Sequence, residues 1–111
     1  MTTTDGVVLR DTSDETGSRH LVARFEAGAI LLVGQDIGPS VAAVFGRGLS
    51  EYEWAQKVLP ADVPRALELA GSSGPVLEGL RGLVARGEVD TWIAALRDEG
   101  LVRLEWSHHS D

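Results

Sequence analysis

The hydrophobic pattern of this chain changes its period near residue 60, and that change limits the folds open to it. Before residue 60 the apolar residues alternate with polar ones or form short runs, as they do in strands. From about residue 60 to residue 100 they recur at the 3.6-residue period of amphipathic helices, and the last segment alternates again. Strands followed by helices and one further strand predict an α+β domain with a mostly antiparallel sheet.

Four strands are predicted in the first half, and they cover residues 7–10, 19–26, 29–33 and 51–59. The second alternates between apolar and polar residues, which is typical of a strand with one side in solvent. The third is apolar on both faces, as a central strand covered on both sides would be. The polar run 11–18 predicts a hairpin loop. Residues 39–46 form either a short helix or a loop.

Three helices are predicted next, and they begin near Asp62, Pro75 and Glu88. Asp62 is a candidate N-cap, and glycines at 87 and 100 suit the ends of the second and third helices. A final strand, 101–106, is expected to place Val102, Leu104 and Trp106 on one face. The predicted order is ββββ-ααα-β: about five strands with two or three helices on one face, in a single domain over residues 1–111.

The net charge of −7, from 10 basic and 17 acidic residues, indicates which partners suit the chain. Because the basic residues do not cluster, we expect no binding to nucleic acid or to an anionic membrane. An acidic surface instead attracts basic proteins. No apolar run approaches the roughly 20 residues of a membrane helix. With no visible signal peptide and no cysteine, the chain is expected to be cytoplasmic.

Candidate binding residues gather around the fourth predicted strand. A period of two puts Glu51 and Glu53 on one face, about 7 Å apart, and Trp54 on the other. Asp36 and Arg47 precede this strand in the sequence. Together these five residues form a candidate contact surface for a basic protein, with Trp54 as a partly exposed anchor.

Other chemistries use some of the same residues. The Glu51–Glu53 pair could hydrolyse a glycoside, or it could coordinate a divalent cation together with Asp36. His108 and His109 lie beside a terminal carboxylate and could bind a transition metal, but a mobile tail is the simpler interpretation. No nucleophile motif or phosphate-binding loop is present. We therefore predict no catalytic residue, no metal site and no cofactor.

Two stretches, GQDIGP at 34–39 and EYEW at 51–54, resemble a pattern in small acidic proteins of actinobacteria. The likeness covers most of the chain and extends to the Trp106–Ser107 pair near its end. It implies a shared fold, and it supplies no activity and no catalytic residue.

The sequence therefore predicts a small acidic binding protein, of the inhibitor or immunity type, that shields a basic partner. The alternative is a small metal- or sugar-dependent enzyme or ligand-binding domain that uses Asp36, Glu51 and Glu53. A homodimer that packs through the 29–33 strand or the helical layer is a third hypothesis.

Overall fold

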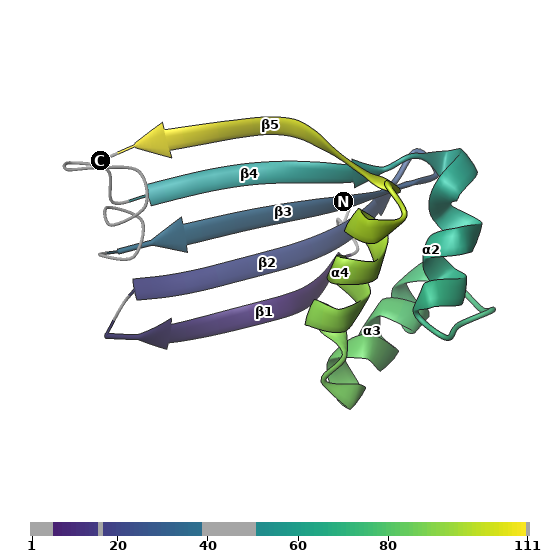
Figure 1. Ribbon diagram of the computed structural model, residues 1–111. Coiled ribbons are helices and arrows are strands. Elements are labelled where there is room, and N and C mark those ends of the chain that lie inside the picture. The colour runs from purple at the N-terminus through teal and green to yellow at the C-terminus, as the bar shows by residue number, and fades with distance from the viewer. Residues whose placement is uncertain (1–5, 16, 39–50, 111) are drawn as a thin grey trace, which may run out of the picture.

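A computed structural model describes residues 6–15, 17–38 and 51–110, and its strands form one antiparallel sheet (Figure 1). The strands are β1 (Gly6–Asp14), β2 (Gly17–Glu26), β3 (Ala29–Ile37), β4 (Glu51–Val58) and β5 (Val102–Ser110), and each pairs with the next. A 3-10 turn, η1 (Pro60–Asp62), and three helices, α2 (Val63–Leu69), α3 (Val76–Arg86) and α4 (Val89–Asp98), connect β4 to β5. The predicted ββββ-ααα-β order and the α+β class are confirmed.

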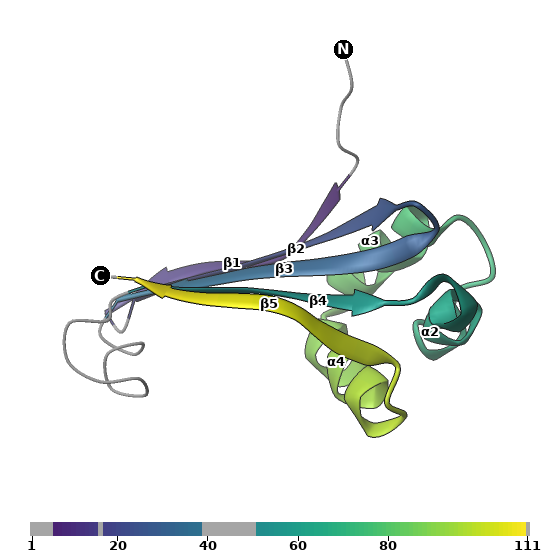
Figure 2. The ribbon, with the colours of Figure 1, turned by 90° about the horizontal axis from the view of Figure 1, so that it is seen from above.

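The helices gather at one end of the sheet, and the other end of the strands extends beyond them (Figures 1 and 2). The core lies between the helices and one face of the sheet, here called the helical face. Its fully buried side chains include Leu21, Ile30, Leu32 and Val58 from the strands and Leu80, Leu83, Trp92 and Leu96 from the helices. No described helix packs on the opposite face, here called the open face. Leu31 and Val33 point to the open face. The apolar residues on this side of β3 are therefore not covered by any described helix.

The strands β1 and β5 both extend further than the sequence predicted. The loop expected over 11–18 is wrong, because β1 continues to Asp14 and Asp11 pairs with His20 of β2. The mobile tail is also wrong, because β5 continues to Ser110 and His108 pairs with Glu53. This end of the sheet lies beyond the helices, so the side chains on both of its faces can be polar. The sequence therefore shows no alternation of apolar and polar residues in these segments.

A bulge in β5 changes which way Trp106 points. Val102 and Leu104 pair with residues of β4 that face the helices, whereas Trp106 pairs with Ala55, which faces the other way. The extra residue, Glu105, shifts the alternation by one. The expectation that these three apolar residues share a face is therefore wrong: Trp106 lies on the open face and is 45% exposed.

The helix boundaries follow the prediction closely. Gly87 and Gly100 follow α3 and α4, and both have a φ of +68°, which glycine adopts without strain. Asp62 directly precedes α2, but its side chain accepts no capping hydrogen bond. The alternative of a short helix over 39–46 falls outside the described residues.

Candidate partner-binding surface

The pairing of β3 with β4 divides the predicted site between the two faces of the sheet. Glu51 and Glu53 lie on the open face, as the period of two predicted, and Glu53 pairs with Gln35. Trp54 and Asp36 lie on the helical face, where they pair with Gly34 and Tyr52. Arg47 falls outside the described residues. The sheet itself separates Asp36 from the two glutamates, so the three carboxylates do not form one site.

The two glutamates form a pair of neighbouring carboxyl groups joined by Gln35. Nε2 of Gln35 donates to Oε1 of Glu51 at 3.2 Å and to Oε1 of Glu53 at 3.3 Å. A hydrogen bond between the two carboxyl groups lowers the pKa of Glu51 and raises the pKa of Glu53. Gln35 and the charge of His108 also lower the pKa of Glu51. The two carboxyl groups therefore lie side by side on the open face and titrate as a pair, with Glu53 keeping its proton to the higher pH.

Replacing Glu53 by glutamine should stabilise the protein at pH 8 and have a smaller effect near pH 4. Because folding raises the pKa of Glu53, the contribution of this residue to stability is lost as the pH rises through its folded pKa. Because folding lowers the pKa of Glu51, the contribution of that residue to stability is lost only as the pH falls through its folded pKa. Glutamine keeps an uncharged donor beside Glu51 at every pH. Urea denaturation midpoints of wild type and Glu53→Gln across this range would measure the effect.

The control is Glu26→Gln, which removes a carboxylate on the open face at the last residue of β2, away from the Glu51–Glu53 pair. Its midpoint relative to wild type should change much less between the two pH values. A Glu53→Gln effect that keeps the same size at pH 4 and pH 8 would contradict the raised pKa of Glu53.

An apolar row crosses the open face next to this pair. The row runs through all five strands and consists of Val8, Val22, Val33, Ala55 and Trp106, which the strand pairing places side by side. Val8 is 49% exposed at one end and Trp106 is 45% exposed at the other. We call this row, together with Glu51 and Glu53, the open-face patch.

Polar rows border the apolar row on both sides. Towards the far end of the sheet lie Asp11, His20, Gln35, Glu53 and His108, and Nδ1 of His20 is 3.6 Å from Oδ1 of Asp11. On the other side lie the basic residues Arg24, Lys57 and Arg103, with Leu31 as the one apolar member of that row. Nζ of Lys57 is 3.2 Å from Oε1 of the bulged Glu105. An apolar centre with a charged rim is the usual composition of a protein interface.

The patch is hollowed on both sides of the apolar row. One depression, of about 420 Å³, lies beside Trp106 and is lined by Ala29, Leu31 and Lys57 among others. A second, of about 220 Å³, lies over His20, Val22 and Glu53. Both could receive side chains of a partner.

Sequence reasoning missed Trp106 because it placed this side chain on the same face as Val102 and Leu104. The signal that could have found the patch is the third predicted strand, which is apolar on both faces although the helices can cover only one. Trp54 lies on the face opposite the two glutamates, as expected, and the tryptophan that shares their face is Trp106.

Comparison with known proteins gives no match to a family model, a curated protein or a solved structure. Within the described ranges, no three histidine, aspartate or glutamate side chains are arranged to hold a metal ion. In the same part of the chain, none of the helices has the length and apolar character needed to cross a membrane.

Proposed function

We propose that this protein is an acidic binding protein that docks a basic protein on the open-face patch. The observation that carries the proposal is the half-exposed Trp106, which ends an apolar row next to the Glu51–Glu53 pair. No described helix covers this face.

Three physical effects favour such a partner. The net charge of −7 steers a basic protein towards the surface. Burial of the apolar row supplies affinity, and exposed tryptophans are frequent hot spots of binding. An arginine or lysine of the partner would meet two adjacent carboxyl groups, and its charge would favour the ionised form of both.

Such binding would act by covering a surface of the partner, as an inhibitor or immunity protein does, and it requires no catalytic group. A divalent-cation site that joins Asp36 to Glu51 and Glu53 loses its support, because Asp36 lies on the other face of the sheet. Glycoside hydrolysis by the Glu51–Glu53 pair stays the alternative.

Affinity capture from the source cells, with the whole chain as bait, tests the proposal. Wild-type protein should retain a basic protein at low salt and release it as salt rises. Trp106→Ala should weaken the purified complex by about 30-fold, the usual minimum for a hot spot. Val84→Ala is the matched control, because it removes an apolar side chain that is 41% exposed on α3.

Equal capture by wild type and Trp106→Ala would overturn the proposal. So would a homodimer in light scattering that Trp106→Ala dissociates, because a second copy would then cover the open face.

A further inference from the structure

A separate cleft of about 310 Å³ lies on the helical face, where the far end of the sheet extends beyond α4. Its lining includes Arg97 of α4, Arg10 of β1, Asp36 of β3, Tyr52 and Trp54 of β4, and Leu104 of β5. Arg97 belongs to the last turn of α4, which forms one wall. The strands form the floor.

Among the described residues, one cation and one anion of this cleft have no ion-pair partner. Arg10 pairs with Asp90 in the first turn of α4. Arg97 and Asp36 form no ion pair with any described residue, although both line the same cleft. Opposite charges that line one cleft suit a ligand that carries both charges.

An aromatic ring also lines the cleft, close to Asp36 along β3. The indole of Trp54 lies against Gly34, so close that a Cβ on this glycine would be 2.3 Å from two ring atoms. Asp36 lies two residues further along β3, about 7 Å away at the usual rise of a strand. Leu104, which is 60% exposed, adds an apolar contact. The middle of the ligand should therefore be apolar.

A buried acceptor adds a further requirement. Oε1 of Gln56, another residue of the cleft lining, is buried and accepts no hydrogen bond from the described residues. Buried acceptors are normally satisfied, and rotation of this side-chain amide would present the oxygen to a donor in the cleft. A peptide N–H is such a donor.

We infer that this cleft binds a short free peptide in an extended conformation. Its terminal carboxylate would pair with Arg97, its terminal ammonium with Asp36, and an apolar side chain would rest on Trp54. An extended residue spans about 3.3–3.6 Å, so a tripeptide holds its two charged ends roughly 10 Å apart and is a suitable probe. The volume lies at the lower end for small-molecule sites. This inference does not depend on the function proposed for the open face.

The test is an NMR titration of the whole chain with the tripeptide Ala-Leu-Ala, followed through the indole N–H signals. The same peptide with an acetylated amine and the same peptide with an amidated carboxyl are the comparison ligands. The free peptide should shift the Trp54 signal and bind about tenfold or more tightly than either blocked form, because hydrogen bonds between charged groups are strong.

Two variants assign the peptide ends to their residues. Arg97→Gln should abolish the preference for the free carboxyl and keep the preference for the free amine. Asp36→Asn should do the reverse. Arg103→Gln, a charge change on the open face, should leave all three affinities unchanged, and thermal melts would show that each variant is folded.

Three results would overturn the inference. The first is equal affinity for the free and blocked peptides. The second is a Trp54 signal that does not move up to about 10 mM peptide, beyond the millimolar range of weak complexes. The third is a shift confined to Trp106, which would place the peptide on the open face.

Discussion

Trp92→Ala is expected to lower the free energy of unfolding by about 3–5 kcal/mol, the usual cost of truncating a buried aromatic side chain. Trp92 is 2% exposed and lies between α4 and the rest of the core. A domain of this size is stable by about 5–15 kcal/mol. The variant should therefore be close to its unfolding transition at ordinary temperatures.

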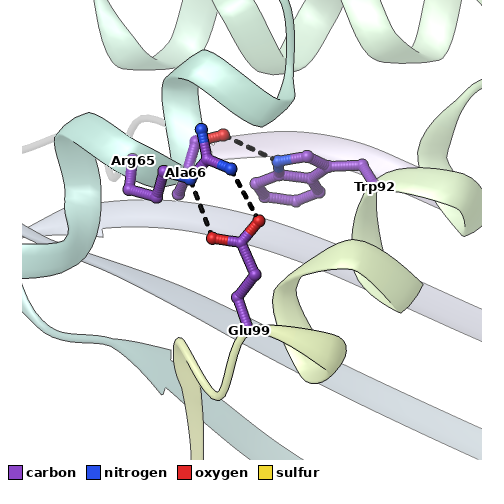
Figure 3. A network of polar contacts seen from close by, with 4 residues as sticks. All are labelled: Arg65, Ala66, Trp92 and Glu99. Atoms are coloured by element: carbon purple, nitrogen blue, oxygen red, sulfur yellow. Dashed lines mark hydrogen bonds and ion pairs between the residues drawn. The ribbon is translucent and has the colours of Figure 1, made fainter.

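Trp92 also joins two helices through polar contacts (Figure 3). Its indole Nε1–H donates to the carbonyl oxygen of Ala66 in α2 at 2.9 Å. Beside it, the guanidinium of Arg65 donates to both carboxylate oxygens of Glu99, at 2.8 and 2.7 Å. The indole therefore fixes α4 against α2 at a point where a paired arginine holds the same two segments together.

Trp92→Phe separates the packing from the hydrogen bond. The carbonyl oxygen of Ala66 also accepts from the N–H of Ala70 at 3.1 Å, so loss of the indole donor leaves no unsatisfied acceptor. The phenylalanine variant should therefore lose much less stability than Trp92→Ala. Urea denaturation followed by circular dichroism would rank the two variants. A loss below about 1 kcal/mol for Trp92→Ala would contradict the placement of α4, because surface substitutions usually stay within that range.

The parts of the fold that the sequence predicted well are those that contact the core. Val89, Trp92, Ile93 and Leu96 of α4 are all buried, as their spacing indicated. Leu21 and Ala23 of β2 are buried for the same reason. In these segments one physical effect, burial of apolar side chains, sets the pattern of the sequence.

The candidate site was harder to predict because it depends on how neighbouring strands pair. Alternation within β4 correctly placed Glu53 and Trp54 on opposite faces. It could not show that Asp36 shares a face with Trp54, because that depends on the register between β3 and β4. The single bulged residue Glu105 had the same kind of effect on Trp106. No local pattern specifies either feature.

Gly34→Ala should destabilise the protein by about 1–3 kcal/mol, the usual cost of overpacking. Gly34 is buried in the middle of β3, directly opposite Trp54. The new Cβ would lie 2.3 Å from two atoms of the indole, and a real Cβ does not approach another atom so closely. Both strands are held by neighbours in the sheet, so the ring must lift away. That movement would also remove the aromatic floor of the cleft.

The same substitution should become neutral or stabilising once the ring is absent. In a Trp54→Ala background nothing opposes the new methyl group, and alanine is favoured over glycine inside a strand by roughly 0.5–1 kcal/mol. Urea denaturation of wild type, both single variants and the double variant forms a complete cycle, and we expect Gly34→Ala to change sign between the two backgrounds. An equal loss in both would show that the glycine is needed by the backbone of β3 and not by the ring of Trp54. That result would mean that the Trp54 ring is not held against Gly34, and the proposed peptide site would then lack a fixed aromatic surface.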